Sequence, residues 1–206
     1  MKNILIHGLG QDEKAWDKVI EKLDNIKVSS PNLFSLVKGE KMNYGNLYKA
    51  FSCYCNDKKE KLNLCGLSLG GILAIDYAKQ YPEKVNSLII IGTPYEIPEK
   101  ILKLQNIVFK FMPKKTFTKM GCEKKAFINL VNSMVDLDIK SNLDKIDCKT
   151  LVLCGENDKT NLESSRLLYE HIKNSELEII ENSLHEVNMD NPKELADIIS
   201  KFWEEI

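Results

Sequence analysis

The residues with the clearest chemical meaning are Gly66-Leu67-Ser68-Leu69-Gly70, which match the motif G-x-S-x-G. An apolar run over Leu62–Leu67 precedes the serine, and a helical pattern from Leu69 to Tyr81 follows it. This context predicts a sharp strand-to-helix turn that raises the Ser68 hydroxyl above the end of a sheet. A glycine-rich turn can carry an incidental serine, but the strand before it and the helix after it favour a nucleophile.

A serine hydroxyl needs a base to become a nucleophile, and histidine has a suitable pKa at neutral pH. The chain has three histidines. His171 lies near the end of a polar helical pattern and is expected at the surface. His7 follows an apolar strand, and its expected role is to hold a loop by hydrogen bonds. His185 lies in the loop after the last predicted strand and is the predicted general base.

The base needs an acid that orients its ring and stabilises its charged form. Asp158 ends the segment Leu151–Asp158, which reads as a strand running into a turn. We predict Asp158 as this acid. Glu156 is the nearest competitor, and a simple turn or capping role for Asp158 is the alternative. The chemical groups then follow the chain order Ser68, Asp158, His185.

An anionic intermediate at Ser68 needs hydrogen-bond donors that hold its oxygen. The backbone N–H of Leu69, directly after the serine, is one predicted donor. The second should come from the loop after the first strand, His7-Gly8-Leu9-Gly10, and we assign it to the N–H of Leu9.

Short apolar runs alternate with helical patterns and would position these groups along one edge of a parallel sheet covered on both faces. The predicted strands are Asn3–His7, Lys27–Leu33, Leu62–Leu67, Val85–Ile91, Thr150–Cys154 and Leu177–Ile180. Helices are expected at 16–23, 44–55, 69–81, 160–172 and from 192 onward, with Thr160 and Glu163 as a capping box and Asn191 capping the last helix. Residues 95–148 interrupt the alternation of what is otherwise a single domain over residues 1–206.

The composition excludes several classes of partner. Lys+Arg number 29 and Asp+Glu 30, so no nucleic acid or anionic membrane is expected to bind. The start of the chain lacks a signal-peptide pattern and no segment is apolar for long enough to span a bilayer, which favours a cytoplasmic location. Without a secretory signal, the six cysteines are expected to be reduced thiols; their spacing argues against a metal site, and no cofactor is expected.

Taken together, four pieces make the chain resemble the α/β-hydrolase fold family, and in particular its small bacterial serine esterases. The pieces are His7–Gly10 with Trp16 downstream, Gly66–Gly71, Gly155–Asp158, and His185 with Pro192 seven residues later. The resemblance implies a three-layer α/β-hydrolase fold with a mostly parallel sheet of about six strands, in which residues 95–148 form a small helical lid. Two points depart from the usual pattern. The chain begins at what is usually the third strand, and no glycine directly precedes His185.

The expected activity is that of a serine hydrolase cleaving a small or medium apolar carboxylic ester through an acyl-enzyme. Two apolar stripes in the lid suggest an apolar substrate, although ordinary packing onto the sheet must account for much of their surface. The stripes are Ile101, Leu104, Val108 and Phe111, then Phe127, Leu130, Met134 and Leu137. Other reactions of this fold, including a lyase, stay open, as do a ligand-binding signalling protein that retains the triad and a scaffold that docks a partner. Arg166 is the only arginine, which counts against a lyase acting on polyanionic acids. The oligomeric state is left open.

Overall fold

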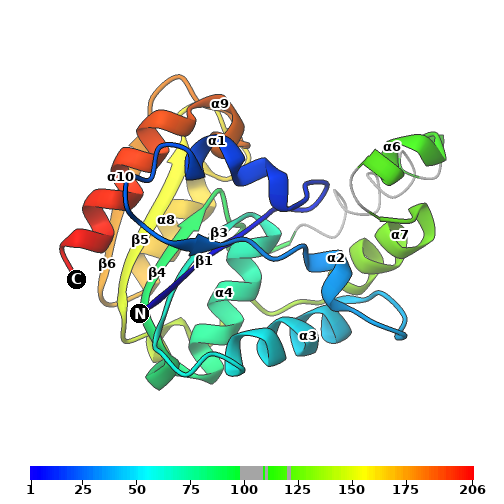
Figure 1. Cartoon of the computed structure of the whole chain (residues 1–206), viewed down its shortest axis with the longest axis horizontal. Coiled ribbons are helices and arrows are strands. Elements are labelled where there is room, and N and C mark those ends of the chain that lie inside the picture. Colours follow the sequence, from blue (N-terminus) through cyan, green and yellow to red (C-terminus); the bar gives the residue numbers. More distant parts are fainter. Residues whose placement is uncertain (98–108, 110, 120–121) are drawn as a thin grey trace.

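The centre of the molecule is one six-stranded parallel sheet (Figure 1). The computed structural model describes residues 1–97, 109, 111–119 and 122–206. Every pair of neighbouring strands is parallel, and the strand order is β2-β1-β3-β4-β5-β6. The strands are β1 Lys2–Ile6, β2 Val28–Ser29, β3 Leu62–Leu67, β4 Val85–Ile91, β5 Lys149–Gly155 and β6 Ser175–Ile180. The predicted parallel sheet is confirmed.

Helices cover both faces of this sheet, as Figure 1 shows, so the molecule has three layers. The helical elements of the first half are η1 Glu13–Trp16, α1 Asp17–Ile20, α2 Leu33–Leu36, α3 Tyr44–Asn56, α4 Leu69–Gln80 and η2 Pro82–Lys84. Those of the second half are α6 Lys114–Lys119, α7 Lys124–Ser133, η3 Leu143–Lys145, α8 Leu162–His171, α9 Val187–Asp190 and α10 Pro192–Glu204.

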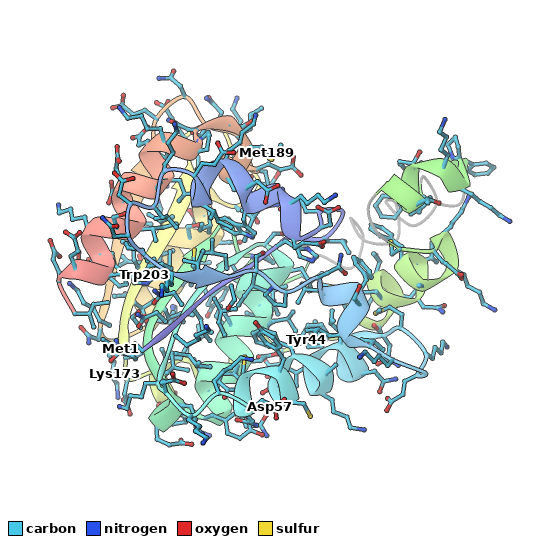
Figure 2. All side chains as sticks on the ribbon, viewed as in Figure 1. Met1, Tyr44, Asp57, Lys173, Met189 and Trp203 are labelled. Carbon is cyan, nitrogen blue, oxygen red and sulfur yellow. The ribbon has the colours of Figure 1, made fainter. Side chains whose placement is uncertain are left out.

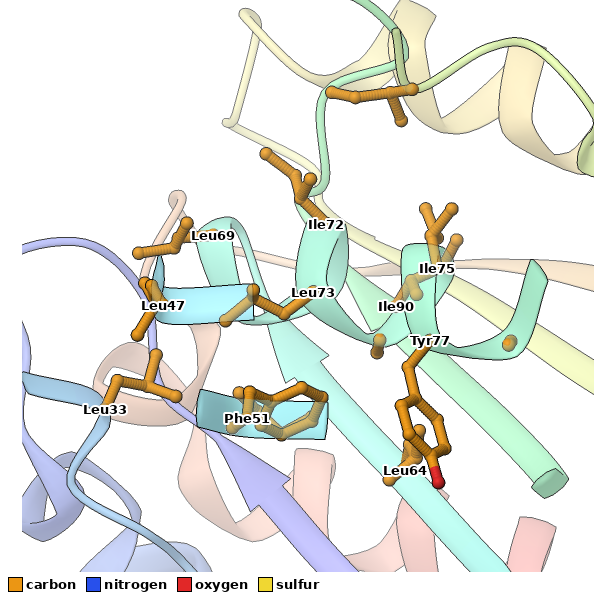
Figure 3. Packing of buried hydrophobic residues seen from close by; sticks show 14 of the residues in the cluster. Leu33, Leu47, Phe51, Leu64, Leu69, Ile72, Leu73, Ile75, Tyr77 and Ile90 are labelled. Carbon is orange, nitrogen blue, oxygen red and sulfur yellow. The ribbon is translucent and has the colours of Figure 1, made fainter. Parts of the chain in front are cut away.

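Alternation along each strand divides the apolar side chains between two cores, because successive strand residues point to opposite faces. In β4, Leu88 and Ile90 join the core that contains α3, α4 and α8, while Ile89 and Ile91 join the core that contains η1, α1 and α10. The first core is shown in Figure 3, where Phe51 and Tyr77 meet edge to face at 6.0 Å. In the second, Trp203 of α10 lies against the sheet (Figure 2).

Three local predictions need correction. The predicted strand Lys27–Leu33 shrinks to Val28–Ser29, because Asn32 caps α2 and Leu33 is already helical. The capping box at Thr160 does not form, since the N-cap of α8 is Asn161. At α10, Asn191 is the N-cap, but its side chain bonds the carboxylate of Glu194 rather than a backbone N–H.

The segment 95–148, predicted as a lid, carries α6 and α7 at one end of the molecule in Figure 1. Of the first predicted stripe, Ile101, Leu104 and Val108 lie outside the described residues, and Phe111 is exposed. In the second stripe, Phe127, Leu130 and Met134 are buried in the main core and Leu137 is half-buried against it. Phe127 packs edge to face on Phe117 at 5.2 Å. These side chains therefore stabilise the fold and do not offer a free apolar surface.

Candidate active site

Ser68 occupies the sharp turn between β3 and α4. Its backbone has φ 53° and ψ −111°, a conformation that costs a non-glycine residue about 1–3 kcal/mol and is typical of functional sites. The strain is held on one side by the Ser68 N–H, which donates to the carbonyl of Ile91 at 2.9 Å. On the other side α4 begins at once, with the N–H of Ile72 donating to the Ser68 carbonyl at 3.0 Å. The side chain is thus raised on a fixed backbone at the carboxyl edge of the sheet.

The two glycines of the motif allow this turn to pack tightly. A Cβ on Gly66 would lie 2.3 Å from the carbonyl oxygen of Gly70, and a Cβ on Gly70 would lie 2.2 Å from that of Ile6. Both separations are far below van der Waals contact, so no other residue fits without moving the backbone. As a result the N-terminus of α4 sits directly against the end of β1.

Asp158 and His185 form a hydrogen-bonded pair. The Nδ1 atom of His185 lies 2.7 Å from Oδ2 of Asp158. A carboxylate only accepts, so the proton is on Nδ1, and the neutral ring has its lone pair on Nε2. Asp158 is buried, whereas 40% of the His185 side chain is exposed. The ring therefore has one nitrogen fixed inside the protein and the other available as a base.

The pair shifts both pKa values in the directions expected for an ion pair. The hydrogen bond to Asp158 raises the pKa of His185 above its usual 6.5, against the opposing effect of burial. Burial alone would raise the pKa of Asp158, but hydrogen bonds from His185 and Asn161 outweigh it and hold the pKa of this carboxyl below its usual 3.8. Asp158 is thus ionised at neutral pH and stabilises the protonated ring.

Asn161 also belongs to this pair and was missed in the sequence. Its side-chain amide donates to Oδ1 and Oδ2 of Asp158 at 3.0 and 2.9 Å, and its backbone N–H donates to Oδ1 at 3.3 Å. The same Nδ2 lies 3.2 Å from Nδ1 of His185. An asparagine three residues after an aspartate in a turn is a recognisable signal for local hydrogen bonding. We overlooked this signal because the start of the helix was assigned to a capping box at Thr160.

Glu156, the competing acid, points elsewhere. Its Oε2 accepts the backbone N–H of Asn182 at 3.0 Å, and the residue is exposed. It therefore holds the turn that precedes the histidine loop. His171 is exposed on α8, where its Nδ1 lies 2.8 Å from the Leu167 carbonyl. This agrees with the predicted surface position.

Gly92 lies where the serine turn and the Asp158–His185 pair meet. It follows Ile91, whose carbonyl holds Ser68, and it has φ +52°. A Cβ on Gly92 would be 3.0 Å from Nδ1 of His185 and 3.2 Å from Oδ2 of Asp158. The end of β4 therefore connects the backbone of the serine directly to the imidazole–carboxylate pair.

His7 holds the loop after β1, as predicted. The Leu33 N–H donates to its Nε2 at 3.0 Å, so the proton is on Nδ1, which lies 2.9 Å from the Gly8 carbonyl and donates to it. Burial lowers the pKa of His7, which keeps the ring neutral. The next residue lies beside Ser68, since a Cβ on Gly8 would be 3.6 Å from Cβ of Ser68. Leu9 follows Gly8, and Leu69 is the first residue of α4, where helix N–H groups lack intrahelical acceptors.

The buried cysteines are unreactive thiols. Cys55, Cys65 and Cys154 are buried free thiols, and burial raises the pKa of Cys55 to about 12 and that of Cys154 to about 11. These values suppress thiolate reactivity at neutral pH. Within residues 1–97, 109, 111–119 and 122–206, no cluster of three or more His, Cys, Asp or Glu side chains is arranged to hold a metal ion. None of the helices in those same ranges is long and apolar enough to cross a membrane.

Comparisons with known proteins agree with the fold. The profile of the family Hydrolase_4, described as Serine aminopeptidase, S33, matches residues 46–130, which contain Ser68. The Arabidopsis thaliana alpha/beta hydrolase domain-containing protein VTE7 is 29% identical over 178 residues, covering 70% of this chain and 54% of that protein. The mouse monoacylglycerol lipase ABHD6 is 25% identical over 186 residues, covering 70% and 55%. The chain thus spans a little over half the length of these curated relatives.

A solved structure from a study of carboxylesterases of the thaumarchaeon Nitrososphaera gargenis superposes with a TM-score of 0.83 at 21% identity, covering 99% of this chain and 90% of that one. At this identity the match establishes the fold. Together with the parallel six-stranded sheet and the serine turn, this match shows that the chain has the α/β-hydrolase fold.

Proposed function

We propose that this protein is a serine hydrolase that cleaves a small or medium apolar carboxylic ester, with Ser68 as nucleophile, His185 as general base and Asp158 as the orienting acid. The observation that carries the proposal is the 2.7 Å contact between Asp158 and His185, formed beside a serine held at φ 53°. Strained serine, oriented imidazole and buried carboxylate at one sheet edge are what a serine hydrolase needs.

The reaction would run in two steps. Ser68 Oγ attacks the ester carbonyl while Nε2 of His185 takes the hydroxyl proton. The oxyanion that forms accepts hydrogen bonds from the N–H groups of Leu9 and Leu69. The imidazolium then protonates the leaving alcohol, which departs and leaves an acyl-serine. Water, deprotonated by Nε2, attacks this acyl group, and the proton returns to Ser68 as the acid is released. Asp158 stays ionised throughout and stabilises the imidazolium.

Two features support an apolar ester. Leu184 directly precedes His185 and keeps 59% of its surface exposed, and Leu9 is half-buried beside Gly8. Among the relatives, one is named as a monoacylglycerol lipase and one solved structure comes from a study of carboxylesterases, both ester-cleaving activities. Arg166, the only arginine, lies on the exposed surface of α8 beside Glu163, so it offers no clamp for a polyanionic acid. Residues 95–148 are proposed as a lid over the site.

Covalent trapping tests the proposal. The purified protein is treated with a fluorophosphonate, and the modified peptide is mapped by mass spectrometry. We expect one adduct, on Ser68, absent in Ser68→Ala and strongly slowed in His185→Ala, because only a serine with a base and oxyanion donors is reactive. Ser133, whose hydroxyl donates to the carbonyl of Leu130 in α7, is the matched serine that should remain unlabelled.

A turnover screen then separates reaction classes. p-Nitrophenyl esters of rising acyl length are compared with a thioester and a p-nitroanilide. Faster turnover of short and medium esters supports the proposed activity. Preference for the anilide would assign a peptidase instead, and labelling without turnover would favour a lyase or a ligand-binding protein. Failure of native protein to label at Ser68 would remove the proposal.

A further inference from the structure

A pair of buried side-chain amides joins the loop after β1 to the histidine loop. Nε2 of Gln11 donates to Oδ1 of Asn188, and Nδ2 of Asn188 donates to Oε1 of Gln11, both at 3.3 Å. Asn188 is fully buried and Gln11 nearly so. Gln11 follows the loop 7–10, while Asn188 lies on α9, three residues after His185. Two segments 177 positions apart in the chain are thereby connected.

The pair also controls the backbone at Gly8. The Gly8 N–H donates to Oε1 of Gln11 at 3.3 Å, and the Gly8 carbonyl accepts the backbone N–H of Gln11 at 3.3 Å in addition to the His7 ring. Asn188 fixes the Gln11 side chain from the other side and donates a further hydrogen bond to the Ala15 carbonyl at 3.0 Å. Both polar groups of the Gly8 backbone are therefore fixed by hydrogen bonds.

Peptide planarity carries this restraint to Leu9. The carbonyl of Gly8 and the N–H of Leu9 belong to one planar trans peptide, in which they point in opposite directions. Because the Gly8 carbonyl is fixed on the His7 ring and the Gln11 N–H, the Leu9 N–H points away from these two groups. Leu9 directly follows Gly8, whose Cβ position would be 3.6 Å from Cβ of Ser68. Any change that frees the Gly8 carbonyl frees the Leu9 N–H as well.

We infer that Gln11 and Asn188 are positioning residues that fix the position of the Leu9 N–H relative to His185. The inference rests on the proposed function, in which Leu9 donates to the oxyanion and His185 acts as base. A buried amide pair could merely stabilise the fold, but this one connects the two loops that carry those groups. A shift of either loop changes the distance between donor and base, and small misplacements lower the rate steeply.

The test compares Gln11→Met and Asn188→Leu, which keep similar volume and remove the amide, with the double variant. Asn63→Leu is the matched control, since Asn63 is a buried amide bonded to Asn3, Asn86 and Ser87 at the opposite end of β3. We expect each site variant to lower kcat about tenfold with KM changed by less than about twofold. The inflection of the pH–rate curve should not move, because the Asp158–His185 pair is untouched.

The double variant should lose little more kcat than either single variant, since both disrupt one contact. Asn63→Leu should lower the melting temperature without lowering kcat of the folded protein. Site variants that melt earlier but keep the parent kcat would overturn the inference, as would rate losses that multiply in the double variant.

A second readout does not depend on turnover. In amide NMR spectra, Asn188→Leu should shift the Gly8 and Leu9 signals, and Asn63→Leu should leave them in place. Unshifted signals in Asn188→Leu would show that the two loops are not coupled and would overturn the inference. Shifted signals in a protein whose parent form neither labels nor hydrolyses esters would mean instead that the proposed function is wrong, while the connection between the loops stands.

Discussion

Both carboxylate oxygens of Asp158 accept hydrogen bonds from the side-chain amide of Asn161, at 3.0 and 2.9 Å. The amide fixes the orientation of the carboxylate, and Oδ2 also lies 2.7 Å from Nδ1 of His185. Ion-pair geometry at the proposed site therefore depends on a neutral residue as well as on the two charged ones.

Replacing Asn161 should weaken catalysis without removing it. Asn161→Ala deletes hydrogen bonds to a charged group, each worth about 1.5–3 kcal/mol, so we expect kcat to fall about tenfold or more. Asn161→Asp should be worse, because a second carboxylate beside Asp158 raises the pKa values of both. Ester turnover of the two variants checks this order. The neighbouring exposed Asn157→Ala is the control, and equal activity of all three variants would contradict the assigned role of Asn161.

The pH dependence follows from the raised pKa of His185. Only the neutral ring can take the Ser68 proton, so turnover should fall as pH drops through the folded-state pKa, which lies above the ordinary 6.5. The kcat/KM profile of the free enzyme measures this inflection. In Asp158→Asn the stabilising carboxylate is gone, so the inflection should move to lower pH. An inflection at or below 6.5 in the parent protein would contradict the ion pair.

Stability should show the opposite dependence for the two partners. Asp158 has a lowered pKa, so its stabilisation is present above the unfolded value near 3.9 and is lost as pH falls through the folded pKa. His185 has a raised pKa, so its contribution is present below about 6.5 and is lost as pH rises through the folded pKa. Melting curves of the parent and of His185→Gln between pH 5 and 9, about the range in which histidine titrates, should converge at the alkaline end.

Substitution of the two candidate acids separates their roles. Asp158→Asn should lower kcat by up to about 10⁴-fold while the protein stays folded, because the ring loses its fixed tautomer and its counter-charge. Glu156→Gln should keep most activity, since an amide oxygen can still accept the Asn182 N–H. The reverse result, with Asp158→Asn silent and Glu156→Gln crippled, would mean that the acid has been assigned to the wrong residue.

Alanine variants of two glycines with positive φ allow the effect of backbone strain to be told apart from the effect of disrupting the site. Gly39 has φ +71° with nothing near its Cβ position, whereas Gly92 has φ +52° and a Cβ position against His185 and Asp158. Both alanine variants should lose about 1–2 kcal/mol of stability from the left-handed backbone. Gly39→Ala should keep its kcat, and Gly92→Ala should lose most of it, as measured by ester hydrolysis and denaturant unfolding. Retained activity in Gly92→Ala would contradict the packing at the end of β4.

Local patterns in the sequence were sufficient to predict the parallel sheet and the strand–turn–helix around Ser68. Strand, turn and helix around Ser68 lie within residues 62–80, and their signals are neighbouring apolar residues and glycines, which act over a few positions. The strands at Leu62–Leu67 and Val85–Ile91 were predicted to the residue. Ser68, Asp158 and His185 each follow a predicted strand, and the carboxyl ends of parallel strands lie at one edge of the sheet.

The tertiary structure decided what depends on contacts between distant segments. The Gln11–Asn188 pair spans 177 positions, and neither residue has a local pattern that names its partner. The same holds for the contact of His185 with Asp158 and Asn161, because only the folded turn shows that Asp158 lies against the ring while Glu156 contacts Asn182. Phe127, Leu130 and Met134 have the spacing of an amphipathic helix whether they face a substrate or a core. Helical periodicity shows which side of a helix is apolar, but only the packed neighbours determine what that side touches.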